Sequence, residues 1–157
     1  MTDPHQRVLD ALTAAGLSFE VTRHAHVTSL AEAAAARGIE ERDLVKTLVV
    51  RRAEGDHVFV LVPGDRTFSW PKLRAVLGVT RVSMPDAATA LAVTGFERGT
   101  ITPFGSLTPL PVYADETIGG GLISLGVGLH DAGVTVDADA ALVALHATRA
   151  DLTDAPD

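Results

Sequence analysis

The sequence LVKTLVVRRAEGDHVFVLVP, residues 44–63, decides the fold that we expect for this chain. It holds two runs rich in apolar and β-branched residues, 46–52 and 57–62, and each has the length of a typical strand. The AEGD segment between the runs has the residue types of a tight turn. The sequence therefore predicts two paired strands that form a hairpin.

Helices are predicted on both sides of this hairpin. Ser29 and Glu32 form a capping box in front of AEAAAARG, and Gly38 is typical of a helix end. A helix over 4–15 starts with proline in its first turn. Other helices are expected over 70–78 with Ser69 as cap, 85–94 before Gly95, and 137–147 with Asp137 as cap; strands are expected over 17–22, 79–84, 110–115, within 119–128 and over 133–137.

Strands and helices that interleave in this way favour an α/β fold, with helices packed on a mixed sheet. The length of 157 residues fits one domain, which we place at residues 1–150. The acidic segment 151–157 is expected to be a frayed tail.

Composition narrows the functional classes. The chain is 46% hydrophobic, yet no apolar run approaches the roughly 20 residues of a membrane helix, so we expect no membrane partner. The first residues show no basic leader before an apolar segment, and we expect a cytoplasmic protein. The absence of cysteine excludes disulfides, thiolate metal ligands and a cysteine nucleophile.

Charge is unevenly distributed along the chain. The net charge of −7 argues against broad binding to a phosphate backbone, and we expect no DNA partner. Residues 42–81, however, hold eight basic and four acidic side chains, including both lysines, Lys46 and Lys72. This segment either binds the anionic end of one ligand or is a solvated mixture of charges.

Several segments have competing interpretations. The stretch TGFERGTITPFGS, residues 94–106, holds three glycines and a proline, more than an ordinary turn requires. Gly119 to Gly121 lack the surroundings of a phosphate-binding motif and indicate a tight turn. Lys46 opens an apolar strand, where its ammonium group either reaches solvent or meets an anion.

Hydrolytic motifs are sparse. No G-x-S-x-G nucleophile elbow is present, so the sequence does not support serine catalysis. His24 and His26 would point to one face of a strand, but the sequence places no third metal ligand beside them.

The order and spacing of five motifs resemble the YbaK/ProX family over roughly residues 5–148. They are HAHVTSLAEAAA (24–35), LVKTLVV (44–50), WPKLRAVLG (70–78), TGFERGTITPFG (94–105) and PVYADE (111–116). Members of this family are aminoacyl-tRNA deacylases related to the editing domain of bacterial prolyl-tRNA synthetases. The resemblance implies a single α/β domain on a mixed, curved sheet, and hydrolysis of the ester that joins a wrong amino acid to tRNA.

The resemblance also assigns candidate site residues. Lys46 matches the family's strand-borne lysine, and Gly99 to Pro103 match its G-x-x-x-P loop, which makes Lys46, Gly99 and Pro103 the candidate catalytic residues. The candidate substrate-binding residues are His26, Thr28, Thr47, Thr94, Gly95, Phe96, Ile101, Thr102 and Ser124. Phe96 stands where tyrosine is common, and the later glycine-rich segment departs from the simpler family pattern.

Elementary chemistry agrees with these roles. A lysine can pair with a phosphate of the terminal nucleotide, and backbone N–H groups of a glycine-rich loop can stabilise an oxyanion. With no nucleophile motif, we expect a bound water to attack, oriented by the terminal ribose hydroxyl and by carbonyls near Gly99. No cofactor is expected.

Three hypotheses remain open. The first is a free-standing editing hydrolase acting on the 3′ end of mischarged tRNA, with Cys-tRNA or Ala-tRNA of the proline type as substrates and a synthetase as a further partner. The second is a module of the same fold that binds a tRNA end, a nucleotide or a synthetase without catalysis. The third is a metal-dependent hydrolase built on His24 and His26.

Overall fold

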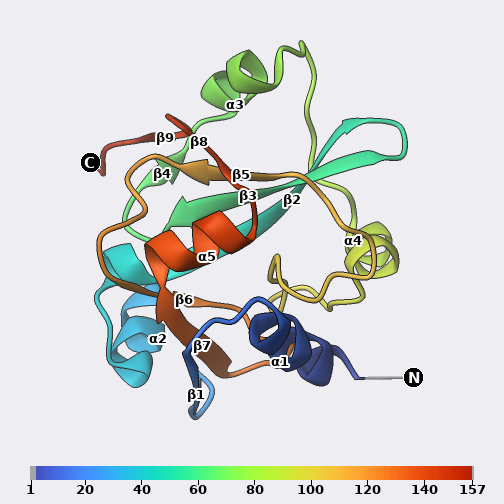
Figure 1. The fold of residues 1–157 in the computed structure, drawn as a ribbon. Coiled ribbons are helices and arrows are strands. Elements are labelled where there is room, and N and C mark those ends of the chain that lie inside the picture. Colours follow the sequence, from blue (N-terminus) through green and yellow to red (C-terminus); the bar gives the residue numbers. More distant parts are fainter. Residues whose placement is uncertain (1–2, 157) are drawn as a thin grey trace.

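The protein was analysed as a computed structural model that describes residues 3–156. The elements, in chain order, are α1 (Pro4–Ala14), β1 (Phe19–Arg23), α2 (Leu30–Arg37), the 3-10 turn η1 (Glu41–Asp43), β2 (Val45–Ala53), β3 (Asp56–Pro63), β4 (Thr67–Phe68), α3 (Trp70–Leu77), α4 (Ala87–Thr94), β5 (Val112–Asp115), β6 (Leu122–Leu125), β7 (Ala132–Asp137), α5 (Ala138–Ala144), β8 (Thr148–Ala150) and β9 (Thr153–Asp154). Figure 1 shows their arrangement.

The main sheet has the strand order β2-β3-β5-β8 and is mixed. β2 pairs with β3 antiparallel, as the hairpin prediction required, while β3 with β5 and β5 with β8 are parallel. A second, antiparallel sheet has the order β1-β7-β6. A bridge between Leu44 and Ser124 connects the two sheets. The α/β fold with a mixed sheet is thus confirmed.

β3 is the central element of the core, because every residue from His57 to Pro63 is buried. On one face, its Phe59 and Leu61 join a core with α1 and α5, and α5 lies across the front of the sheet in Figure 1. On the other face, Val58 and Val60 pack with Leu73 of α3 and with Leu152 near the C-terminus. The hairpin is therefore held from both sides.

Short polar side chains fix the helix starts as predicted. Ser29, Ser69 and Asp137 each accept a backbone N–H at the start of α2, α3 and α5. Gly38 and Gly95 follow α2 and α4 with φ values of 69° and 78°, the left-handed conformation that glycine adopts at low cost.

Two expectations about the chain were wrong. Residues 79–84 do not form a strand, because only Ser83 reaches the sheet, where it bridges Arg51 at the edge of β2. Residues 151–154 are not frayed: Leu152 is fully buried and β9 pairs with β4. Asp157 lies outside the described residues.

Within residues 3–156, no helix is both long and apolar enough to cross a membrane.

Candidate functional site

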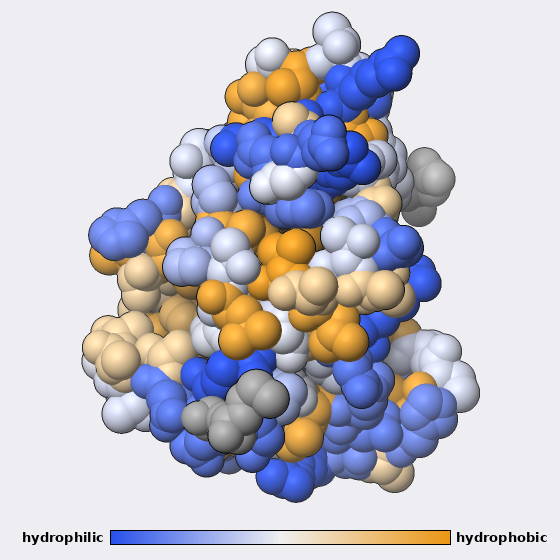
Figure 2. All heavy atoms as spheres, turned by 90° about the vertical axis from the view of Figure 1, so that its right-hand side faces the viewer, coloured by the Kyte–Doolittle hydropathy of each residue, from blue (hydrophilic) through white to orange (hydrophobic). Residues whose placement is uncertain are grey.

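A cavity of about 610 Å³ lies along the edge of β2. Three main segments line it: residues 44–49, residues 84–87 and the 98–101 loop. The residues that line it are Arg37, Leu44, Val45, Lys46, Thr47, Leu48, Val49, Met84, Pro85, Asp86, Ala87, Ala90, Arg98, Gly99, Ile101 and Gly126. Figure 2 shows the side of the molecule toward which the β2–β3 hairpin and α4 project.

The edge of β2 is unpaired along this cavity. Apart from its pairing with β3, this stretch of chain has two backbone bridges within residues 3–156. One is at Leu44, just before β2, and the other is at Arg51. Arg51 directs both its N–H and its C=O outward to Ser83. Because outward-directed residues alternate along an antiparallel strand, the backbone groups of Thr47 and Val49 also face the open edge. The cavity wall therefore offers backbone donors and acceptors to a ligand.

Lys46 contributes an uncompensated charge to this wall. It is exposed, and no hydrogen bond or ion pair joins it to any other residue of the described part of the chain. Lys72, the other lysine, is instead paired with Asp151 and Asp154 at 3.0 and 3.1 Å. Of the two, only Lys46 is available for an external anion.

Arg37 and Arg98 add two further cations to the same cavity. Arg37 is half-buried and donates hydrogen bonds to Ser124 Oγ at 3.2 Å and to the carbonyl of Ala132 at 2.9 Å. Burial lowers the pKa of its guanidinium, and no carboxylate within residues 3–156 pairs with it. A desolvated cation without an acidic partner favours binding of an anion.

Asp86 is the one acidic side chain that lines the cavity among the described residues. Its carboxylate caps α4 by accepting the backbone N–H of Thr89 at 2.7 Å. Hydrogen bonds from Thr89, from its backbone first, lower the pKa of Asp86. Asp86 is therefore ionised, and the cavity stays positive because Arg37, Lys46 and Arg98 outnumber this one carboxylate.

The Gly99 loop lines the same cavity as Lys46. Gly99 has φ of 89°, and the loop is fixed by a 3.1 Å hydrogen bond from the amide of Gly128 to the carbonyl of Thr100. A Cβ on Gly126 would lie 2.6 Å from the carbonyl oxygen of Ile101, so glycine is needed for this close approach. Within residues 3–156, the amides of Gly99 and Ile101 donate no hydrogen bond.

The predicted residues that the structure brings into the cavity are Lys46, Thr47, Gly99 and Ile101. The hydroxyl of Thr47 is buried and has no hydrogen-bond partner in the described chain. Ser124 is fully buried behind the cavity, where its hydroxyl accepts the bond from Arg37.

Thr94, Gly95 and Phe96 lie outside the cavity lining. Thr94 is buried, and its hydroxyl donates to the carbonyl of Ala90 and accepts the amide of Phe96. Phe96 is fully buried beneath the guanidinium of Arg7, which is 5.1 Å from the ring centroid. These contacts give the three residues a role in ending α4 and packing the core.

The remaining predicted residues are also placed away from the cavity lining. Thr102 and Pro103 are buried. His26 contacts Asp131 at 3.2 Å on the surface, and the amide of Thr28 binds the carboxylate of Glu32.

The two histidines considered for metal binding make separate contacts. His24 accepts a hydrogen bond from Arg37, whereas His26 contacts Asp131. No group of three or more histidine, aspartate or glutamate side chains within residues 3–156 is arranged to hold a metal ion.

Sequence reasoning missed Arg37, Arg98 and Asp86 as cavity residues. Arg37 in the last turn of α2 and Asp86 before α4 have the ordinary signature of helix-end charges and caps. Their second role depends on where the helices end relative to β2, which sequence spacing does not encode.

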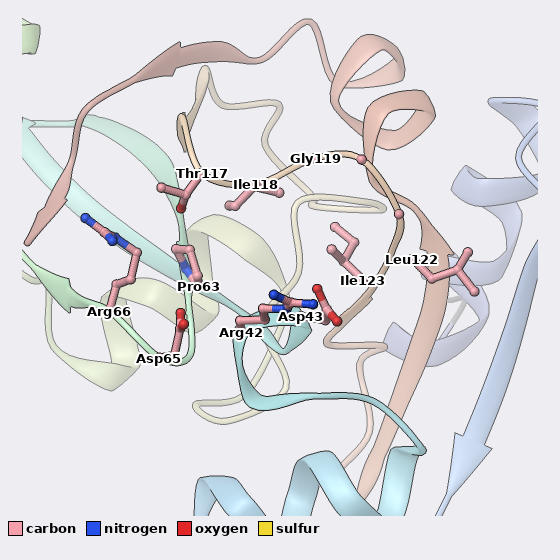
Figure 3. A pocket seen from close by; sticks show the side chains of 12 residues that line it. Arg42, Asp43, Pro63, Asp65, Arg66, Thr117, Ile118, Gly119, Leu122 and Ile123 are labelled. Carbon is pink, nitrogen blue, oxygen red and sulfur yellow. The ribbon is translucent and has the colours of Figure 1, made fainter. Parts of the chain in front are cut away.

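A separate pocket, shown in Figure 3, lies beside the Gly119–Gly121 turn. Its volume is about 480 Å³. Its cations already have partners: Arg42 pairs with Glu40 at 2.7 Å, and Arg66 donates to Thr153 at 2.6 Å. The Lys46 cavity is therefore the better candidate for an anionic ligand.

Comparisons with known proteins agree with this fold. A family model described as an aminoacyl-tRNA editing domain matches residues 24–146. A proline–tRNA ligase of Desulfovibrio desulfuricans is 38% identical over 93 residues, which are 59% of this chain and 16% of that protein. A second ligase of the same kind, from Thermosipho melanesiensis, is 31% identical over 99 residues, 63% of this chain and 17% of its own length. The chain thus spans about a sixth of these relatives.

Among solved structures, one described as a candidate trans-editing enzyme for prolyl-tRNA synthetase has a TM-score of 0.86 and 28% identity. The match covers 98% of this chain and 99% of that one. The similarity therefore extends over nearly all of that solved chain.

Proposed function

The chain belongs to the aminoacyl-tRNA editing domain family, and on that premise we propose that it hydrolyses the ester of mischarged tRNA in trans. The substrate class is the 3′ end of a tRNA that carries the wrong amino acid. The near-complete match to a candidate trans-editing enzyme supports action on released tRNA. Such an activity belongs in the cytoplasm, where tRNA is charged.

The observation that carries this proposal is that unpaired Lys46, on the open-edged strand β2, lines the same cavity as the Gly99 loop. The terminal nucleotide of an aminoacyl-tRNA holds a phosphate close to the ester carbonyl. Lys46 binds that phosphate, with Arg98 as a second cation at the mouth. This places the ester against the loop.

The reaction requires a nucleophile and a site for the developing charge. A water oxygen attacks the ester carbonyl carbon, and the amides of Gly99 and Ile101, which have no other acceptor in residues 3–156, donate to the oxyanion. The bond to the ribose oxygen then breaks, and the proton from water passes to that leaving oxygen. The neighbouring ribose hydroxyl orients the water.

Selection of the amino acid falls to the apolar part of the cavity and to Thr47. Val45, Val49 and Ile101 line the cavity together with Thr47, whose buried hydroxyl has no partner of its own within the described chain. A small side chain such as that of alanine or cysteine fits these surroundings. The proline–tRNA ligases among the relatives support tRNA of the proline type as carrier, and a prolyl-tRNA synthetase as a partner.

A panel of mischarged tRNAs, in which the amino acid and the tRNA body are varied separately, tests this function. We expect hydrolysis of alanyl- or cysteinyl-tRNA of the proline type, at a rate that exhaustive chelation leaves unchanged. If the protein binds every tRNA of the panel and leaves all esters intact, it is the binding module and not the hydrolase. Loss of hydrolysis on chelation would instead support the metal-dependent alternative.

A further inference from the structure

A second cavity continues the first one along β2. It is lined by Arg51, Arg52, Arg74 and Arg81, together with Ala53, Thr80, Val82 and Ser83. The same two stretches of chain border both cavities: β2 and the residue before it supply 44–49 to the first and 51–53 to the second, and the stretch from α3 to the start of α4 supplies 84–87 and 80–83. The backbone bridge between Arg51 and Ser83 lies at the border between these two sets of residues.

Most of the positive charge of this second cavity is not neutralised by the protein. Arg52 pairs with Asp56 at 2.8 Å, but Arg51, Arg74 and Arg81 have no ion pair or side-chain hydrogen bond within residues 3–156. Arg74 also lies in the last turn of α3, where a cation is favourable in any case. Arg51 and Arg81 are both exposed and have no such explanation.

The clustering is unexpected in a protein of net charge −7. Three unpaired guanidinium groups around one hollow repel one another unless an anion lies between them. Guanidinium groups bind phosphate oxygens in a fork geometry, and arginine is the preferred side chain for that purpose. The hydroxyl groups of Thr80 and Ser83 border the same hollow and are suitable phosphate donors.

The spacing of the two cavities fits the sugar–phosphate backbone of one continuous nucleic-acid strand. Thr47 and Arg51 are four residues apart on a strand that rises ~3.3 Å per residue, which gives about 13 Å between the sites. This distance is short enough for one nucleic-acid strand to contact both cavities, so the arginines lie where the strand leading to the 3′ end would continue.

We propose that the arginine cluster of Arg51, Arg74 and Arg81 binds the phosphate backbone of the tRNA strand that leads to the 3′ end, while the aminoacylated terminal nucleotide occupies the Lys46 cavity. This inference rests on the proposed function. It assigns a binding surface to the part of the tRNA that lies outside the Lys46 cavity. The Arg51–Ser83 bridge fixes the orientation of the two cavities, so that backbone binding sets the register of the ester.

Two substrates separate this role from catalysis. One is a full-length mischarged tRNA, and the other is a CCA trinucleotide carrying the same amino acid ester. In a double variant, Arg51→Gln with Arg81→Gln, we expect KM for the full-length tRNA to rise on the order of tenfold with kcat unchanged. The kcat/KM for the trinucleotide should stay at the wild-type value. The Arg81→Lys variant should keep most of the affinity, because the charge is retained.

Arg23→Gln is the matched control. Arg23 is an exposed arginine at the end of β1, and it lines neither cavity. Its variant should bind and hydrolyse both substrates like the wild type. Equal losses on tRNA and trinucleotide in the double variant, or no loss on tRNA, would overturn the proposal.

Binding of uncharged tRNA provides a readout that does not depend on hydrolysis. Each phosphate contact contributes ~0.7–0.9 to the slope of log K against log salt concentration, so the double variant should lose roughly 1.5 from that slope. If the wild-type protein hydrolyses no ester but the double variant still shows this loss of slope, the proposed reaction is wrong and the tRNA-binding surface is supported. If the wild type binds anionic lipid vesicles, and the double variant loses this binding but still binds tRNA normally, the cluster binds a membrane instead.

Discussion

Arg51 and Ser83 exchange two backbone hydrogen bonds, with N···O distances of 2.8 and 3.1 Å. This bridge anchors the segment after α3 to the edge of β2 and leaves residues 45–50 of β2 open on the side of the Lys46 cavity. The irregular segment 79–86 thus forms a wall of the site, although only one of its residues pairs with the sheet.

Replacement of Lys46 by alanine should lower kcat/KM for the mischarged tRNA by at least about 100-fold, because the phosphate loses its partner in the cavity. The free energy of unfolding should not change, since Lys46 has no partner within residues 3–156. Lys72→Ala is the control, and it should keep wild-type activity. Single-turnover deacylation measures both variants, and wild-type rates for Lys46→Ala would refute the assignment.

Replacement of Gly126 by alanine should displace the Gly99 loop. The new Cβ would lie 2.6 Å from the carbonyl oxygen of Ile101, so the loop must move away from Gly126. We expect kcat to fall at least roughly tenfold, because catalytic donors act only at short range. Gly120→Ala has open space around its Cβ and a φ of 72°, so it should cost about 1 kcal/mol of stability and no activity.

Leu152→Ala should destabilise the fold by about 3 kcal/mol, because the side chain is fully buried against Leu73 and the valines of β3. Val143→Ala removes a side chain that is 75% exposed and should change stability by less than about 0.5 kcal/mol. Urea denaturation monitored by Trp70 fluorescence compares them. Equal midpoints for the two variants would mean that the C-terminal segment is not part of the core.

Asp115 should contribute to stability in a pH-dependent manner. Burial alone would raise the pKa of its carboxyl group, but hydrogen bonds from Thr117, the Leu152 amide and Thr153 together lower it below the ordinary 3.8. A lowered folded-state pKa means that the unfolded chain takes up the proton first as the pH falls. The stabilisation is therefore complete above about pH 4 and is lost as the pH falls through the folded-state value.

The Asp115→Asn variant isolates this effect. It should lose about 3 kcal/mol at pH 7, because an amide cannot accept all the donors that face the carboxylate. Between pH 5 and pH 2, its unfolding free energy should fall less than that of the wild type. Parallel curves of unfolding free energy against pH for the two proteins would contradict the role of Asp115.

Local features of this protein were predictable because they depend on neighbours in sequence. The hairpin at 44–63, the Ser29 capping box and the glycine ends of α2 and α4 all appear as predicted, since each satisfies backbone groups within a few residues. Lys46 and Gly99, two residues that the family resemblance assigned to the site, both line one cavity.

Other features were decided only by tertiary contacts. Leu152 is buried because Asp115, far earlier in the chain, accepts its amide and holds the C-terminal segment on the core. Phe96, in a motif that indicated substrate contact, is buried under Arg7 of α1.

The sequence by itself determined the hairpin, the caps and the family, because these follow from short-range hydrogen bonding and from ordered motifs. Only the tertiary structure decided which cations share a site. Arg37 and Lys46 meet at one cavity, and Arg51, Arg74 and Arg81 meet at the next. The physical reason is that the edge of β2 stays unpaired until distant segments dock against it, and the charges are brought together only by that docking.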